Sequence, residues 1–503
     1  MDQHPDNFSH LLTTNAPLDE KATAHFQGRL RALEITLEQM SFGTKKHPKK
    51  EPDPAKELLA LCLVCRRWRE AALNTHRLWS SVDIACYFSP TVSRKVETWL
   101  NRSGALPKRL KILAGECEES TTPCHQCKLS NELARFLAEG PRLEHLALQC
   151  STPLCLKGLL NVVKSHEDRS TAGSWDAIKS LRINFSQEWT EREPFNPADT
   201  VFLQLPPVTS LGLRLPPLPC LHRQSTGTYN PDLNYYEAVS DVGMALHIPK
   251  TTLARLSHLK LHCNWNGARV IDILRSTPSL HSLELGFDGT TQRFGDSSQI
   301  RKLLDNNLVF PNLQILRLCK SHCEVYEILQ FIQTPSLLEL DIDIYHEIAN
   351  KNDPYTAHIL GLLERSSASL RRLRISGTFG IYHVLGKILL SLPSLVHVTM
   401  DGVDLNSSVF SQLESATPPA LPLLECFELF DANLDEFFLP VEVVIGYFES
   451  RKTMKQADGA PLVTTDVIVK TGSPATDFTI SNGVVTMARG SAPGTSELQN
   501  ERV

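Results

Sequence analysis

The sequence lacks the catalytic signatures that residue spacing can reveal. It contains no glycine-rich phosphate-binding loop, no Gly-x-Ser-x-Gly nucleophile turn and no His-Glu-x-x-His motif. His, Asp and Ser are plentiful, but none of them cluster at the spacing of a triad or of a carboxylate pair. We therefore expect a chain that catalyses no reaction itself and holds no cofactor.

The sequence also lacks an excess of basic charge, a long apolar run and an ordered set of cysteines. The net charge is −5, which argues against a nucleic-acid partner. No run approaches eighteen apolar residues, and residues 1–10 do not have the charged-then-apolar order of a signal peptide, so no membrane association is expected. The thirteen cysteines are odd in number and scattered, which favours reduced thiols in the cytosol or nucleus.

One group of cysteines has the spacing of half a zinc site. Cys124 and Cys127 form a C-x-x-C pair, with Cys117 upstream. A second pair is absent, because Cys150 and Cys155 are not at ligand spacing. We interpret the segment as a loop with incidental thiols and predict no metal site, and we keep a metal-binding protein built on these residues as a weaker alternative.

A leucine-rich internal repeat is the strongest signal in the chain. The segment from Pro278 is P-S-L-H-S-L-E-L, and similar segments start at residues 311, 335, 368, 393 and 422. Their starts lie 33, 24, 33, 25 and 29 residues apart. Earlier copies start at residues 142, 177, 207 and 255. The L-x-x-L-x-L core at this spacing predicts a leucine-rich-repeat solenoid, an α/β fold with a curved parallel sheet and helices on its convex face.

The segments between the repeats support this fold. Residues 270–274, 325–332, 358–364 and 382–392 have helical apolar spacing and precede a strand segment. Parallel strands require such crossover connections. Each unit is therefore predicted to be a helix, a short turn and a strand.

Residues 58–79 form a different pattern near the start of the chain. Apolar residues at helical spacing give one wide apolar face beside Arg66, Arg67 and Arg69. Asn74 and Thr75 then interrupt the predicted helix, and a new apolar run begins after them. By spacing alone, this segment could be a plain two-helix corner.

The residue types in this segment resemble the second half of the F-box of fungal F-box proteins. The resemblance is carried by V-C-R-R-W-R at 64–69, A-A-L at 71–73 and R-L-W-S-S at 77–81. It implies docking on a Skp-type adaptor of SCF ubiquitin ligases. The first F-box helix is not matched, because residues 41–54 have no apolar helical face. The implied adaptor-binding residues are Leu58, Leu61, Val64, Arg67 and Trp68.

Composition suggests the domain boundaries. We expect an N-terminal segment at 1–44 with one amphipathic helix at 24–40, a charged proline-rich linker at 45–56 and an F-box-like region at 57–100. The Lys45–Lys50 cluster is interpreted as a solvated linker, with a nuclear signal as the alternative. The remaining segments are the solenoid at 101–470, its insertion at 215–250 and a largely disordered tail at 471–503.

The residues between the repeat leucines are predicted to line the concave face, since strand side chains alternate. We predict target binding by nine of them: Arg182, Lys260, Glu284, Arg317, Glu339, Asp341, Asp343, Arg372 and Arg374. The same reasoning places other residues on this face, among them His262, Cys319, His397, Thr399, Asp401 and Glu428. The adjacent acidic and basic strips are expected to be exposed, to add little stability and to select a partner of opposite pattern.

These patterns lead to one functional hypothesis and one competitor. The chain would be a substrate-recognition subunit of an SCF-type ligase that bridges a Skp-type adaptor to a target protein of unknown identity. The alternative is a leucine-rich-repeat interaction module without adaptor binding.

Overall fold

The computed structural model describes most of the repeat region and part of the segment before it. The described residues are 66–85, 88–113, 131–167, 174–186, 200–215, 248–263, 267–287, 308–321, 323–344, 354–366, 369–377, 382–403, 405–431, 439–451, 465–470, 477–481 and 484–488. Several predictions lie outside these residues, namely the helix at 24–40, the linker at 45–56, the cysteines at 117, 124 and 127, and the insertion between 216 and 247.

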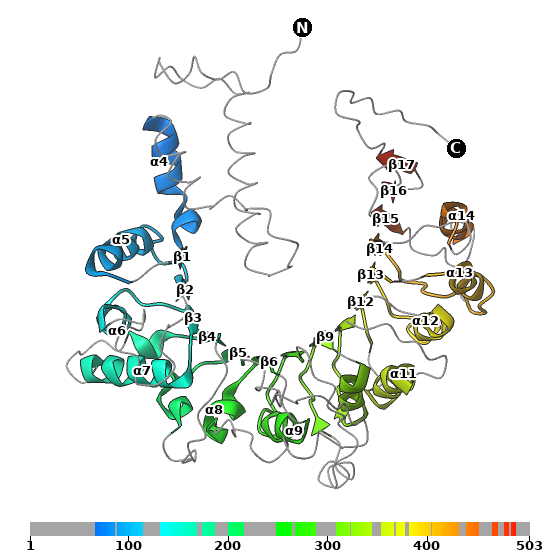
Figure 1. Ribbon diagram of the computed structural model, residues 1–503. Coiled ribbons are helices and arrows are strands. Elements are labelled where there is room, and N and C mark those ends of the chain that lie inside the picture. The colour runs from blue at the N-terminus through cyan, green and yellow to red at the C-terminus, as the bar shows by residue number, and fades with distance from the viewer. Residues whose placement is uncertain are drawn as a thin grey trace, which may run out of the picture. The chain divides into compact units, whose positions relative to one another are not determined.

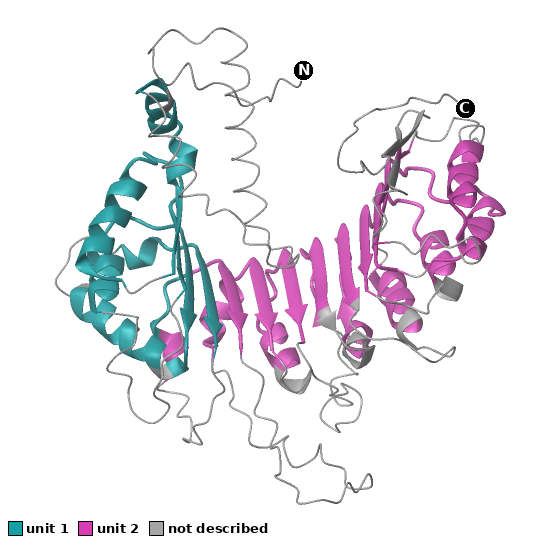
Figure 2. Cartoon of the chain, turned by 45° about the horizontal axis from the view of Figure 1, so that its top comes forward, with its two compact units in different colours: residues 1–187, 204–207 teal, residues 188–203, 208–503 magenta. Residues whose placement is uncertain are grey.

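The chain divides into two compact units, coloured separately in Figure 2. Unit 1 comprises residues 1–187 and 204–207, and unit 2 comprises residues 188–203 and 208–503. Both units are built from parallel strands joined by crossover segments, many of which contain a helix.

Within its described residues, unit 1 contains four parallel strands that pair in chain order. They are β1 (Ser81–Ile84), β2 (Arg109–Leu113), β3 (His145–Cys150) and β4 (Ser180–Phe185). Its helices are α4 (Arg66–Asn74), η1 (His76–Trp79), α5 (Pro90–Asn101), α6 (Asn131–Glu139), α7 (Pro153–Glu167) and η2 (Trp175–Ala177).

Unit 2 has the same plan, and its described part contains nine parallel strands in one ladder. They are β5 (Ser210–Arg214), β6 (His258–His262), β7 (Ser282–Gly286), β9 (Ile315–Ser321), β11 (Glu339–Ile344), β12 (Arg372–Ser376), β13 (His397–Asp401), β14 (Cys426–Phe430) and β15 (Asp466–Lys470). The helices of this unit lie on the convex side of its sheet, and the other face is concave (Figure 1).

The helices of unit 2 confirm most of the predicted crossovers. They are η4 (Val201–Gln204, whose last residue belongs to unit 1), α8 (Lys250–Arg255), α9 (Gly267–Arg275), η5 (Cys323–Gln330), α11 (Pro354–Ser366), α12 (Tyr382–Leu390), α13 (Ser407–Glu414) and α14 (Val441–Arg451). The predicted helix at 325–332 differs, because it is a 3₁₀ helix followed by the short strand β10 (Ile332–Gln333). That strand pairs with β8 (Leu308–Val309) in a separate two-stranded sheet, so its residues are not available for a longer helix.

The buried leucines show why the repeat folds in this way. Leu283, Leu316, Leu340 and Leu373 are in register on neighbouring strands, and each is at most 1% exposed. The first leucine of each repeat is also buried, as Leu280 illustrates with 0% exposure. A single repeat cannot bury this apolar side by itself, so each strand depends on the neighbouring repeats for stability. The predicted leucine ladder and the α/β solenoid architecture are confirmed.

The last strands depart from the prediction for the C-terminal tail. We expected a largely disordered segment from residue 471, but β16 (Asp477–Ser481) and β17 (Val484–Ala488) form strands there. β16 pairs antiparallel with β15, and β17 pairs antiparallel with β16. An antiparallel hairpin needs no crossover helix, so it can extend the ladder with few residues.

Polar side chains secure the helix starts and the turns before the strands. Ser89 caps α5 by accepting a hydrogen bond from Val92 N at 3.3 Å, and Pro90 occupies the first helical position. Ser394, at the second position of its repeat, donates a hydrogen bond to the carbonyl of Leu370 in the preceding repeat at 2.9 Å. Among the described residues, no helix is long and apolar enough to cross a membrane.

Candidate functional site

The end of α4 is held against the first strand of unit 1 by a buried tryptophan. Trp79 is 0% exposed, and its indole nitrogen donates to the carbonyl of Ala72 in α4 at 2.7 Å. Its ring packs edge-to-face on Trp99 of α5, with 4.7 Å between centroids, and the guanidinium of Arg102 lies 4.6 Å from the ring centroid. One side chain therefore joins α4, α5 and the turn that leads into β1.

The surface of α4 is strongly charged where it is described. Arg66 and Glu70 form an exposed i,i+4 ion pair at 2.9 Å. Arg67 and Arg69 are exposed. The opposite side is apolar, with Ala72 buried against the Trp79 cluster. This helix therefore offers a basic surface to solvent, as the sequence predicted.

The five predicted adaptor-binding residues are only partly described. Leu58, Leu61 and Val64 lie outside the described residues. Arg67 is exposed on α4, and Trp68 belongs to the same helix but its side chain is outside what is described.

The nine predicted target-binding residues all lie on strands and alternate with buried apolar residues. In β12 the burial pattern runs exposed, buried, partly exposed and buried from Arg372 to Ile375. Eight of the nine belong to unit 2, and Arg182 belongs to β4 of unit 1. The prediction that these charged residues share the face opposite the core is consistent with this alternation, while their role in binding stays a prediction.

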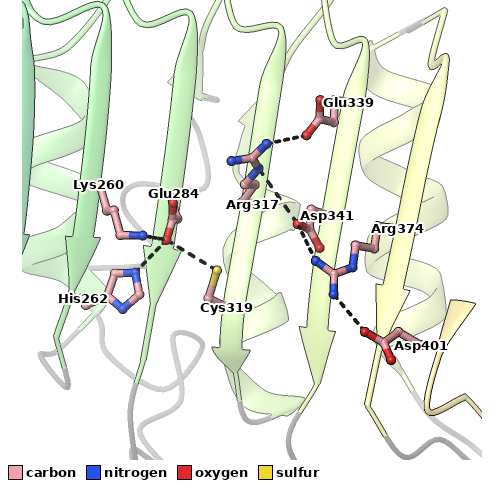
Figure 3. A network of polar contacts seen from close by, with 9 residues as sticks. All are labelled: Lys260, His262, Glu284, Arg317, Cys319, Glu339, Asp341, Arg374 and Asp401. Carbon is pink, nitrogen blue, oxygen red and sulfur yellow. Dashed lines mark hydrogen bonds and ion pairs between the residues drawn. The ribbon is translucent and has the colours of Figure 1, made fainter. Parts of the chain in front are cut away.

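Three polar residues surround one oxygen of Glu284 on the concave face. Lys260 forms an ion pair with Glu284 Oε1, and His262 Nε2 lies 2.9 Å from the same oxygen. The thiol of Cys319 lies 3.7 Å from it (Figure 3). Three strands, β6, β7 and β9, therefore contribute to one half-buried polar centre.

Next to this cluster a chain of alternating charges crosses four strands. Arg317 Nη2 contacts Glu339 Oε1 at 2.7 Å, and Arg374 Nη2 contacts Asp401 Oδ2 at 2.9 Å. Asp341 lies between the two arginines, with 3.9 Å to a guanidinium nitrogen of each (Figure 3). At that distance Asp341 balances their charge without a direct hydrogen bond.

A second histidine cluster occupies β13 and β14. His397 Nε2 lies 3.0 Å from Glu428 Oε2, and Thr399 donates a hydrogen bond to the same oxygen at 2.8 Å. Cys426 is opposite His397 in the strand register.

The surroundings shift the titration of these groups in opposite directions. Burial alone would raise the pKa of Glu284, but hydrogen bonds from His262 and Lys260 outweigh it and lower the pKa to about 2. Burial raises the pKa of Asp341, although Arg374 and Arg317 act against the shift. Burial, followed by the nearby carboxylates of Glu284 and Asp341, raises the pKa of the Cys319 thiol to about 12.

The structure corrects one feature of the predicted concave surface. We expected the acidic and basic strips to be exposed, but the Asp341 side chain is only 17% exposed and its partner Arg374 38%. The long side chains of Arg317 and Arg374, on the two strands beside β11, approach Asp341 and balance its charge. Arg182 and Arg372 are exposed and have no charged partner among the described residues, so they are more accessible to a binding protein.

One segment of the chain matches a known protein family. Residues 53–85 match the family described as F-box-like, so the chain carries an F-box-like segment there. The match includes α4, η1 and β1 and covers a small part of the whole chain. No curated protein matches this chain.

Proposed function

We propose that this chain is the substrate-recognition subunit of an SCF-type ubiquitin ligase. Its F-box-like segment would dock on a Skp-type adaptor, and its repeat surface would bind a target protein. The observation that carries this proposal is the continuity of the F-box-like match with the repeat fold. The match at 53–85 contains the whole of β1, the first strand of the parallel ladder in unit 1, and ends one residue after it.

A subunit that bridges an adaptor and a target must hold the two at a fixed distance and orientation. The packing around Trp79 suits this requirement. Trp79 donates a hydrogen bond to α4, packs edge-to-face on Trp99 of α5 and lies two residues before the first residue of β1, so the F-box-like helix cannot turn freely on the first repeat. In this proposal the chain catalyses no reaction and only brings its target to the catalytic subunits. The proposal places it in the cytosol or nucleus, and the unoxidised thiols of the described cysteines fit a reducing compartment.

The target would be recognised on the concave face of leucine-rich repeats. Support comes from the quoted L-x-x-L-x-L motifs and from the charges on the intervening positions, since parallel-strand solenoids commonly bind partners on this face. Complementary charge governs the choice of partner and the rate of association more than the affinity. Arg182 and Arg372 are the first positions to test because they are exposed.

Direct binding of a purified Skp-type adaptor tests the proposal. We expect a one-to-one complex with micromolar or tighter affinity by calorimetry or size-exclusion chromatography. Arg67→Glu should weaken the complex at least tenfold while leaving the melting temperature unchanged, because Arg67 is exposed on α4. Lys95→Glu is the matched control, since Lys95 is an exposed cation on α5 outside the F-box-like match.

Point substitutions are better than deletion for this experiment. Removing residues 53–85 would also remove Trp79 and β1, so the loss of binding could reflect unfolding of unit 1. If the folded wild-type chain shows no adaptor binding at micromolar concentration, the ligase role is refuted and the repeat interaction module without adaptor binding takes its place.

A further inference from the structure

Three side chains with metal-ligand chemistry converge on the neighbouring strands β6, β7 and β9 of unit 2. The ligand atoms of His262, Glu284 and Cys319 all lie within 4.8 Å of one another. His262 Nε2 is 2.9 Å from Glu284 Oε1, which is 3.7 Å from Cys319 Sγ. The three residues come from three neighbouring strands, so the sheet fixes their spacing (Figure 3).

A glycine on the middle strand provides space for this arrangement. Gly286 pairs with His262 on one side and with Cys319 on the other. A Cβ atom at Gly286 would lie 2.6 Å from His262 Nδ1 and 2.8 Å from its Cε1. The imidazole therefore occupies space that a side chain on β7 would fill, which brings its Nε2 towards Glu284.

The present spacing is close to that of zinc ligands. With bond lengths of about 2.0–2.3 Å and tetrahedral angles, zinc ligand atoms lie roughly 3.3–3.7 Å apart. The two separations involving Glu284 are 2.9 and 3.7 Å, and the one between His262 and Cys319 is at most 4.8 Å, so each pair lies within about 1 Å of the zinc range. All three residues are partly exposed, which leaves a route for an ion to enter.

We propose that His262, Glu284 and Cys319 form a Zn²⁺ site on the concave face, with a fourth position open to water. Neutral imidazole, carboxylate and thiolate together balance the two positive charges of the ion. On binding, Zn²⁺ takes the place of the thiol proton of Cys319, which passes to solvent, and no oxidant or reductant is needed. This site is separate from the proposed adaptor-binding segment and does not depend on it.

Lys260 is the competitor for this site, because its ammonium now pairs with Glu284 Oε1. The Lys260 side chain is 34% exposed, and its flexible stem can carry the ammonium into solvent when an ion arrives. Removing this charge should therefore strengthen metal binding.

A second cluster provides an internal comparison. His397, Cys426 and Glu428 also have ligand atoms within 4.8 Å of one another. This cluster spans only two adjacent strands, with no glycine position between its histidine and cysteine, and Thr399 donates to the carboxylate oxygen that faces His397. The geometry therefore favours the first cluster, and Cys426→Ser is a control of identical chemistry.

The experiment titrates the metal-free full-length chain with Co²⁺, a spectroscopic substitute for Zn²⁺, and then displaces it with Zn²⁺. We expect one equivalent of Co²⁺ to give a thiolate-to-cobalt charge-transfer band. Cys319→Ser should abolish the band and weaken Zn²⁺ binding at least tenfold, and Gly286→Ala should weaken binding because its methyl group displaces His262. Lys260→Met should tighten binding.

Thermal unfolding separates metal binding from folding. The metal-free Cys319→Ser chain should melt close to the metal-free wild type, and Zn²⁺ should raise the melting temperature of the wild type only. If the serine variant is unstable, Glu284→Gln serves as the second test, since it keeps the side-chain shape but removes a charged ligand. The proposal is overturned if the wild type gives no band, if the band survives in Cys319→Ser, or if Cys426→Ser removes it.

Discussion

Substitution of Trp79 tests whether the F-box-like helix is fixed to the repeat fold. Trp79→Phe keeps an aromatic ring in place but removes the indole N–H that donates to Ala72 at 2.7 Å. Losing one such hydrogen bond costs about 0.5–1.5 kcal/mol. The edge-to-face contact with Trp99, itself worth about 0.5–1.5 kcal/mol, would be weakened by the smaller ring. We expect a total loss of about 2 kcal/mol for Trp79→Phe, and about 3–5 kcal/mol for Trp79→Ala.

Hydrogen–deuterium exchange read by mass spectrometry can measure this loss segment by segment. A loss of about 2 kcal/mol corresponds to roughly thirtyfold faster exchange for amides that exchange by opening of this segment. The increase should be confined to residues 66–85 and to α5, because repeats depend mainly on their immediate neighbours. Unit 2 should exchange as in the wild type.

The control is Leu106→Ala in the same unit, because Leu106 is 39% exposed. It should change the free energy of unfolding by no more than about 0.5 kcal/mol. If Trp79→Phe has as small an effect as this control, Trp79 does not hold α4, and the physical argument for a rigid bridge is refuted.

Three further predictions concern unit 2. Leu340→Ala should lower the free energy of unfolding in urea by about 2–5 kcal/mol because Leu340 is 0% exposed, whereas Leu338→Ala, two positions away and 38% exposed, should lower it by less than about 0.5 kcal/mol. Equal losses in the two variants would contradict the buried leucine ladder. Because burial raises the pKa of Asp341, ionisation of its carboxyl group opposes folding, and the stability of the wild type should fall relative to that of Asp341→Asn as the pH rises through this pKa. Parallel curves of melting temperature against pH for the two proteins would disprove this prediction. Arg374→Glu should lower the free energy of unfolding by about 1–3 kcal/mol because it places a third carboxylate between those of Asp341 and Asp401, while Arg372→Glu at an exposed position should lower it by less than about 0.5 kcal/mol. Equal melting temperatures for the two variants would show that these charges are fully solvated.

The leucine repeat was enough to predict the strands and their buried face, because its leucines are the side chains that are buried. Leucines at fixed positions of L-x-x-L-x-L have to point to one side of a strand, and the alternation then places Glu284, Arg317 and Asp341 on the other side. The break at Asn74 and Thr75 likewise marked the end of α4, since the apolar run resumes in Leu78 and Trp79, which are buried. Local patterns of this kind need no knowledge of distant residues.

Register and burial of the charged residues depended on the tertiary structure. His262 and Cys319 are 57 residues apart, so no sequence spacing shows that both face Glu284 or that Gly286 lies between them. Sequence placed Asp341 beside Arg374, but only the packed strands show that Arg317 also covers it and leaves it 17% exposed. Alternation determines which face a side chain is on, while its neighbours are set by strand register and side-chain packing across the ladder.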